Sequence, residues 1–293
     1  MPSNWIAIAS ALAAALCIAL GAVLRQRVAA IVPDDEMGRF GVIGVLIRRP
    51  VWWAGTLVGI GGYVFQAKAL GKGSLLLVQP LLVLSLLFAL PLGAKFSGRT
   101  IRASEWVWAI VLTSAVAILV VVGDPRPGHP HAEARHWAII TGIGLPLVAL
   151  CLIGAKAWPG ARRALLLGVA AGALFGVAAV LTKGVVAHGG DGMVPLLTSM
   201  ETYALIVVGL AATLLQQNAY QAGALQASLP ATTVAEPVVA TALGFLVLGE
   251  YLHTDKDLAM LLVGALIAMV AAAVALAQST GESETDVGLD RVR

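Results

Sequence analysis

Long apolar stretches separated by short polar segments make up most of this chain. A helix of about 20 residues, rising 1.5 Å per residue, crosses the ~30 Å hydrocarbon core of a bilayer. Nine stretches reach this length, at residues 5–24, 51–70, 74–95, 105–122, 136–154, 164–187, 197–220, 224–249 and 257–278. The pattern predicts an all-α polytopic membrane protein with about nine transmembrane helices.

The composition agrees with a membrane protein whose main partner is the lipid bilayer. Hydrophobic residues are 59% and charged residues 12% of 293, and the mean hydropathy is +0.90. Cys17 and Cys151 both lie inside apolar stretches, which indicates packing residues and no disulfide framework. A formal charge of +3 is too small to indicate a nucleic-acid partner.

The distribution of lysine and arginine predicts the orientation in the membrane. Basic residues gather in the loop 25–50, in the segments 95–102 and 156–163, and at the C-terminus. The alternate loops hold only four: Lys72, Arg126, Arg135 and Lys256. Because cytoplasmic loops carry the excess of positive charge, we expect a cytoplasmic-membrane protein with its N-terminus outside and its C-terminus in the cytoplasm.

An internal repeat is visible when the sequence is shifted by about 150 residues. The shift aligns residues 52–80 with 202–230 and pairs Gln66 with Gln216 and Pro80 with Pro230. Helices one to four would form one unit and helices six to nine the other. Since a single helix separates them, the second unit would enter the membrane from the opposite side, so the two four-helix repeats are expected to be inverted.

This repeat predicts the organisation of the whole chain. The ranges are 1–122 for the first repeat, 123–160 for the linker helix and its loops, 161–278 for the second repeat, and 279–293 for a disordered cytoplasmic tail. Inverted repeats recur in secondary transporters, where the substrate site lies near the bilayer midplane between the repeats.

The eighth apolar stretch is the most polar of the nine and carries Glu236. Pro230 and Pro237 each lack an N–H, so they leave the carbonyls of Gln226 and Thr233 without a helical partner. We therefore expect a bent helix that lines an enclosed or wet cavity. A carboxyl group in a low-dielectric medium favours its protonated form, which makes Glu236 a candidate proton carrier. The alternative is a structural carboxyl that stabilises the broken helix.

Amide side chains form the rest of the candidate site for a substrate or a coupling ion. They are Gln66, Gln79, Gln216, Gln217, Asn218, Gln221 and Gln226, and the candidate helix breaks are Pro80, Pro230 and Pro237. For any single amide the alternative is a hydrogen bond between helices, worth ~0.6 kcal/mol on average in measured bundles.

Two lysines lie within spans near the predicted outer face. The long stems of Lys68 and Lys183 can carry their charges to the interface. If turned inward instead, they would pair with Glu201 or with an anionic substrate.

The segment HPHAEARH at 129–136 offers imidazole ligands for a transition metal. Without CxxC or HExxH spacing it is interpreted as a solvated loop, and the metal remains unknown. The sequence contains no nucleophile–base pair, nucleotide-binding motif or zinc spacing, so neither an enzyme nor a cofactor is expected.

Two segments resemble a known superfamily of transporters. The pattern AL-x-x-G-x-L-x-x-V-x-P from Ala69 to Pro80, and EPVVATALGFLVLGE ending at Glu250, are similar to the EamA type of the drug/metabolite transporter superfamily. The WW-x-G opening at Trp52 is similar to the NIPA-like magnesium transporters, which have nine spans. The first resemblance implies transport, and the second implies magnesium.

Three functions remain open at this stage. The leading one is a secondary active transporter of a small metabolite or cation, working by alternating access between the repeats, with proton coupling as an option that the sequence leaves open. One alternative is a magnesium or divalent-cation transporter of the NIPA-like kind. The other is a non-transporting scaffold or regulatory subunit of an envelope assembly. Both a monomer and a homodimer are compatible with the sequence.

The orientation predicts which loops a membrane-impermeant maleimide can reach in intact cells. A single cysteine introduced at Pro127 should be labelled, and one at Ser97 should be labelled only after the cells are permeabilised. The reverse pattern would contradict the orientation and every depth derived from it.

Overall fold

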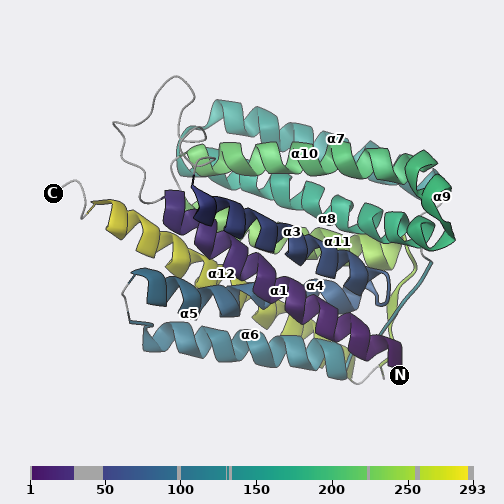
Figure 1. The fold of residues 1–293 in the computed structure, drawn as a ribbon, viewed down its shortest axis with the longest axis horizontal. Helices are drawn as coiled ribbons and strands as arrows, with labels where there is room; N and C mark the ends of the chain where they lie inside the picture. The colour runs from purple at the N-terminus through teal and green to yellow at the C-terminus, as the bar shows by residue number, and fades with distance from the viewer. Residues whose placement is uncertain are drawn as a thin grey trace.

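The structure is a computed structural model that describes residues 2–29, 49–97, 100–129, 131, 134–222, 225–254 and 258–289. Its helices run alongside one another in an elongated bundle (Figure 1). In order they are α1 (Pro2–Ala29), α3 (Pro50–Leu70), α4 (Leu75–Val83), α5 (Ser85–Ser97), α6 (Ala103–Val121), α7 (Ala134–Ala157), α8 (Ala161–Asp191), α9 (Met193–Thr198), α10 (Met200–Gln221), α11 (Leu225–Leu246) and α12 (Ala259–Leu289). Two short strands, β1 (Pro125–Arg126) and β2 (Tyr251–Leu252), pair antiparallel.

Eight helical segments of the described chain are long and apolar enough to cross a membrane. They correspond to eight of the nine predicted spans, so the chain is a multi-pass membrane protein. The remaining prediction, residues 51–70, forms α3, which has 21 residues but is not among the eight. Gln66, Lys68 and four glycines lower its hydropathy although its length is sufficient.

The third predicted span is broken into two helices. α4 ends at Val83, Leu84 forms a tight turn in which its N–H donates to the Leu81 carbonyl, and α5 begins at Ser85. Pro80 lies inside α4, and the break comes one turn after it.

Pro230 and Pro237 do not break α11, which corrects the expectation from the sequence. The helix continues through both residues from Leu225 to Leu246. Each proline removes one hydrogen bond, but the bonds of the residues on either side keep the helical path. Thr232 lies between the two prolines, and its hydroxyl donates to the carbonyls of Gly168 on α8 and Ser228 on α11.

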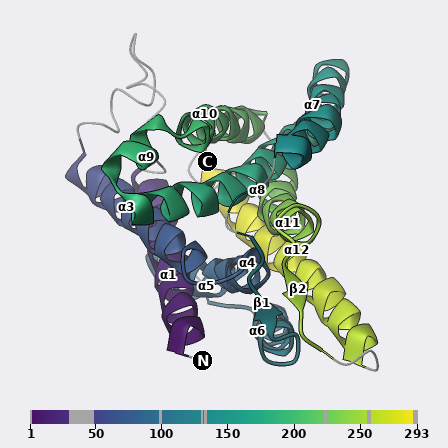
Figure 2. The same cartoon turned by 90° about the vertical axis from the view of Figure 1, so that its right-hand side faces the viewer.

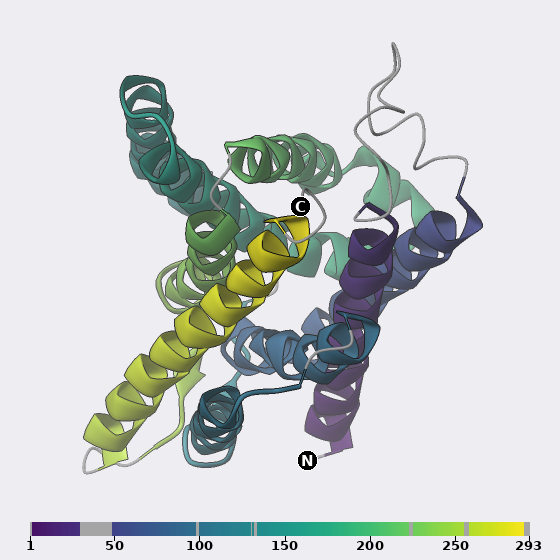
Figure 3. The same cartoon turned by 90° about the vertical axis from the view of Figure 1, so that its left-hand side faces the viewer.

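The two halves of the chain use corresponding helix pairs. In the first half α1 packs against α3, α4 and α5, and in the second half α8 packs against α10 and α11. The pair of α6 and α12 joins the halves on one side (Figure 3). Contacts of α8 with α3, and of α11 with α4, join them in the middle. A twofold axis relating the halves remains a prediction.

The connecting segments differ in part from the predicted organisation. α7, the predicted linker helix, packs along α8 and projects from the rest of the bundle (Figure 2). α12 continues to Leu289, through most of the tail expected to be disordered, because no proline interrupts the hydrogen-bond ladder there. Most of the predicted cytoplasmic loop 25–50 is outside the described residues.

Glycines spaced four residues apart allow α8 and α11 to approach closely. A Cβ atom added to Gly168, Gly172 or Gly176 would lie 2.7–2.9 Å from atoms of α11. For Gly172 the nearest atoms include the Thr232 carbonyl oxygen at 2.7 Å and the Glu236 nitrogen at 3.0 Å. Small residues of this kind are typical of membrane helix interfaces, where backbone contact replaces the hydrophobic effect.

This contact predicts opposite effects for two Gly→Ala substitutions. Gly172→Ala should destabilise the fold by ~1–3 kcal/mol, because the added methyl group meets backbone atoms that cannot move independently. Gly142→Ala on α7 is the matched control, since no atom lies within 4 Å of its Cβ position and alanine favours a helix. Thermal unfolding in detergent, followed by tryptophan fluorescence, measures both. Equal melting temperatures would contradict the close contact.

Candidate functional site

The loops at one end of the bundle are tied to each other (Figure 2). The pairing of β1 with β2 joins the loop after α6 to the loop after α11. The His129 N–H also donates to the Leu248 carbonyl at 2.7 Å. Gly128 is required here, because an added Cβ would lie 1.9 Å from the Leu248 oxygen.

The C-terminal end of α11 turns sharply and places Glu250 beneath these loops. Gly249 adopts a positive φ of 62°, a conformation that glycine reaches without steric cost. The Glu250 N–H then donates to the Gly244 carbonyl at 2.9 Å, as in the glycine caps that commonly end helices. Gly244 also leaves room for the carboxylate, since a Cβ there would lie 2.8 Å from Glu250 Oε2.

The Glu250 carboxylate caps the N-terminus of α4. Its Oε1 accepts from the Leu75 N–H at 2.9 Å, and its Oε2 accepts from the Leu76 N–H at 3.1 Å. The Ser74 hydroxyl accepts from the Leu77 N–H at 3.1 Å. The three N–H groups of the first turn, which have no partner within the helix, are thereby satisfied. The negative charge also interacts favourably with the positive end of the helix dipole.

Lys183 of α8 completes this buried charged centre. Its Nζ donates to Glu250 Oε1 and forms a salt bridge with it. Lys183 is 6% exposed and Glu250 is 2% exposed. Removing both charges from water costs free energy that a salt bridge repays only when the remaining polar atoms are also bonded. The N–H groups of α4 supply that additional bonding.

The salt bridge corrects the expected partner of Lys183. The sequence analysis allowed a pair with Glu201 if the lysine turned inward, but the described partner is Glu250. The reason is the direction of neighbouring residues on α8. Glu201 lies against Gly184, where an added Cβ would be 2.3 Å from Glu201 Oε2. Since residues 183 and 184 point about 100° apart around a helix, Lys183 and Gly184 face different neighbours. Lys68, the other predicted lysine, is exposed.

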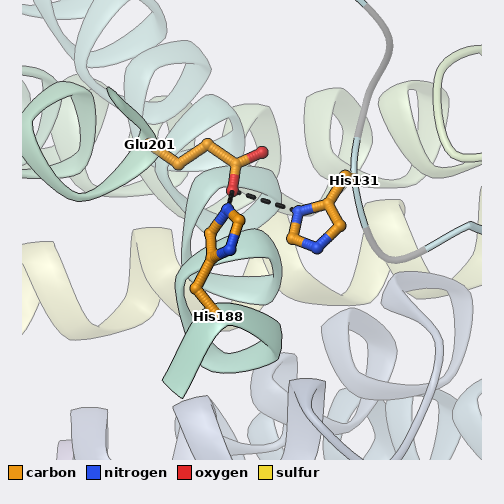
Figure 4. Close-up of side chains that lie close together, drawn as sticks. All are labelled: His131, His188 and Glu201. Carbon is orange, nitrogen blue, oxygen red and sulfur yellow. Dashed lines mark hydrogen bonds and ion pairs between the residues drawn. The ribbon is translucent and has the colours of Figure 1, made fainter. Parts of the chain in front are cut away.

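Glu201 belongs to a second polar cluster at the same end, with His131 and His188 (Figure 4). His131 comes from the loop before α7, His188 from the last turns of α8, and Glu201 from the first turn of α10. Glu201 Oε2 lies 3.2 Å from His131 Nδ1 and 3.1 Å from His188 Nε2. The two imidazole rings are 4.3 Å apart between centroids. All three residues are partly buried.

The predicted amides do not converge on one site. Gln66 on α3 and Gln79 on α4 are buried. Gln216 is half-buried on α10, while Gln217 and Asn218 are exposed there, and Asn218 donates to the Leu214 carbonyl of its own helix. The side chains of Gln221 and Gln226 lie outside the described part of the structure.

Gln79 is the predicted amide with an unmet hydrogen-bonding group. It is 1% exposed, and its Nε2 has no hydrogen-bond partner among the described residues. A buried donor left without a partner costs about 1–3 kcal/mol, so such groups call for an explanation such as a bound molecule.

Glu236 is half-buried near the middle of α11. Its backbone nitrogen and oxygen lie against Gly172 and Gly176 of α8. Within the described residues its carboxyl has no salt-bridge partner, in contrast to Glu250. Glu236 lies eight positions before Gly244, which places it about 12 Å along α11 from the charged centre.

Residue patterns alone identified neither of the two charged clusters. Glu250 entered the sequence analysis only through the superfamily resemblance, as the residue after Leu248 and Gly249. Its position at the end of an apolar stretch, directly after a glycine, was the available signal. His188 carried no local signal, because its two partners come from other segments of the chain.

Comparison with known proteins gives one full-length similarity. No family model matches this chain, and no solved structure matches it. The chain is 42% identical over 284 residues to an uncharacterized protein of Corynebacterium glutamicum. The match covers 96% of this chain and 97% of that protein. The likeness to drug/metabolite transporters remains a prediction.

The buried salt bridge predicts a strong effect for loss of one charge. Lys183→Met should destabilise the protein by about 3–5 kcal/mol, because the Glu250 charge stays buried without its cation. The double variant Lys183→Met/Glu250→Gln should recover much of this loss, since no unpaired charge remains and the amide oxygen can still accept from α4. Lys68→Met is the control, expected within ~0.5 kcal/mol of the wild type. Melting curves of the wild type, the single variant Glu250→Gln and these three variants decide. Additive effects of Lys183→Met and Glu250→Gln in the double variant would refute the pairing.

Proposed function

We propose that this chain, which belongs to the same protein family as the uncharacterized Corynebacterium glutamicum protein, is a secondary active transporter of a small metabolite or cation. The observation that carries the proposal is the buried contact of Lys183 and Glu250 at the N-terminus of α4. Ionisable groups inside membrane proteins are costly to bury, and they commonly mark substrate or ion pathways.

The contact is placed where a gate between the two halves of a transporter would be. α4 belongs to the first half, and it is the first part of a broken membrane-spanning segment. α8 and α11 belong to the second half and supply Lys183 and Glu250. The contact lies at the start of this span and not at its break at Leu84, which suits a gate at one end of the pathway. In secondary transporters the repeats rock against each other around a transport site that lies deeper, near the bilayer midplane.

We infer that the salt bridge closes one end of the pathway. In the orientation that the positive-inside pattern predicts, this end faces the outside of the cell. Opening would separate the α4 N-terminus from Glu250 and expose both charges and the N–H groups of Leu75 and Leu76 to water. Hydration would replace the lost hydrogen bonds, so the closed and open states can be close in free energy.

Two polar side chains further from this end are the candidates for binding. α4 begins and α11 ends near the contact between Leu75 and Gly244. Later residues of α4 and earlier residues of α11 therefore both lie further from this end. Gln79, with its unpartnered Nε2, therefore lies about one turn deeper than Leu75, and Glu236 lies deeper still. We propose Gln79 as a donor to the substrate and Glu236 as the group that carries a coupling proton.

Divalent-cation transport is the second candidate, and the His131, His188 and Glu201 cluster favours it. Magnesium, the ion implied by the NIPA-like resemblance, prefers six oxygen ligands in an octahedron. Two imidazole nitrogens favour a transition metal instead. A scaffold subunit is the third candidate, and it would make the buried salt bridge purely structural.

Flux measurements in proteoliposomes test the proposal. The purified protein is first screened by thermal shift against amines, amino acids and divalent metal salts, and the compounds that stabilise it are then assayed for counterflow. Accumulation of a labelled amine or amino acid supports metabolite transport, and accumulation of a metal supports the second candidate. Stabilisation by none of the compounds, no flux, and a partner that co-purifies at fixed stoichiometry would refute transport.

For the transported compound, Glu236→Gln should separate exchange from proton-driven uptake. Uptake driven by a pH gradient should fall at least 10-fold, because the amide cannot carry the proton. Counterflow without a gradient should be retained, since exchange needs only the binding site and the rocking motion. Folding should be little changed, because a neutral amide costs less to bury than a carboxylate. Normal proton-driven uptake between pH 6 and 8 would show that Glu236 is structural.

A further inference from the structure

We propose that His131, His188 and Glu201 form a binding site for a transition-metal ion of the Zn²⁺ type, with one coordination position left open. The site goes beyond the transport function, because metal binding there requires neither a substrate nor movement of the two halves. Three different elements supply one ligand atom each (Figure 4).

The separations of the ligand atoms fit a tetrahedral metal site. Zn²⁺ binds nitrogen and oxygen ligands at about 2.0–2.2 Å in a tetrahedron, which places neighbouring ligand atoms roughly 3.3–3.5 Å apart. Glu201 Oε2 lies 3.2 Å from His131 Nδ1 and 3.1 Å from His188 Nε2. All the ligand atoms lie within 4.8 Å of one another, so side-chain adjustments of a few tenths of an ångström to about 1 Å would complete the set.

The ligand types select the class of metal. Imidazole nitrogens suit Zn²⁺, Co²⁺, Ni²⁺ and Cu²⁺, whereas Mg²⁺ and Ca²⁺ prefer oxygen ligands. Two histidines and one glutamate are also the ligands of a common class of open zinc site, in which water or a substrate occupies the fourth position.

Contacts that do not involve an ion position Glu201 and the backbone near His131. Glu201 packs against the backbone of Gly184, where an added Cβ would lie 2.3 Å from its Oε2. The Ser199 hydroxyl accepts from the Thr202 N–H and caps the helix that carries Glu201. Two positions before His131, the His129 N–H donates to the Leu248 carbonyl. Such support lowers the entropy lost when ligands are ordered around a metal.

The close approach of the two imidazole rings is compatible with a shared divalent cation. Two protonated rings only 4.3 Å apart between ring centroids would repel each other, whereas neutral rings can either donate one N–H each to Glu201 or bind a metal. Neutral imidazoles that share one divalent cation with a carboxylate avoid this repulsion, because metal ligands bind in their deprotonated form.

Co²⁺ is the probe for the test, because its tetrahedral complexes absorb visible light. The full-length protein, purified in detergent and stripped of metal with a chelator, is titrated with Co²⁺ and then with Zn²⁺. We expect one Co²⁺ per chain with a tetrahedral spectrum, which Zn²⁺ displaces and Mg²⁺ does not. Binding should weaken at acidic pH as protons compete for the histidines.

Substitutions assign the site. His131→Ala, His188→Ala and Glu201→Gln should each weaken Co²⁺ binding at least 10-fold, while His253→Ala should leave it unchanged, because His253 is an exposed histidine at the same end. His131 lies in a loop, so His131→Ala keeps the test decisive if a helix variant fails to fold. Unchanged binding in His131→Ala, an octahedral spectrum, or equal displacement by Mg²⁺ would overturn the proposal. Since the readout is binding, its failure is distinguishable from an absence of transport.

Discussion

Burying two opposite charges away from water is the constraint on which this structure depends. Glu250 and Lys183 are both almost fully buried, and an uncompensated charge there would cost several kcal/mol. The first turn of α4 offsets that cost by donating two backbone N–H groups to the carboxylate. For this to happen, α11 must end in a tight glycine turn, and α4 must begin against it. The start of α4 at Leu75 therefore has an electrostatic reason.

Near the charged centre, different faces of α8 contact different neighbouring elements. Gly168, Gly172 and Gly176 bring one face into backbone contact with α11. Lys183 extends the contact to the start of α4, and Gly184 gives Glu201 of α10 a place against the helix. α8 consequently contacts both halves of the chain. Small residues set the distances between helices, and the few polar residues set which helix ends meet.

Much of the fold could be predicted from the sequence, because the length of an apolar stretch directly reflects the thickness of a bilayer. The broken third span and the continuous α11 could not be told apart from their prolines, since Pro80, Pro230 and Pro237 all lie inside helices. A proline shows which hydrogen bond is lost, but the surrounding packing decides whether the helix stops. The partner of Lys183 was out of reach, because Glu250 lies far along the chain and meets Lys183 only in the folded bundle. The partner of His188 is nearer in the sequence, but the turn between α8 and α10 decides that Glu201 meets His188 and not Lys183.

The positions of Lys183 and His188 on one helix have a further physical consequence. The two residues are five positions apart near the same end of α8. Lys183 pairs with Glu250 in the turn after α11, and His188 pairs with Glu201 of α10. A rotation of α8 about its long axis would disturb both interactions together, whichever element started the movement. Ligands or protons that stabilise one of them would then change the equilibrium of the other, with the same coupling free energy in both directions. In that case α8 would link the loops at this end thermodynamically to the buried charged centre.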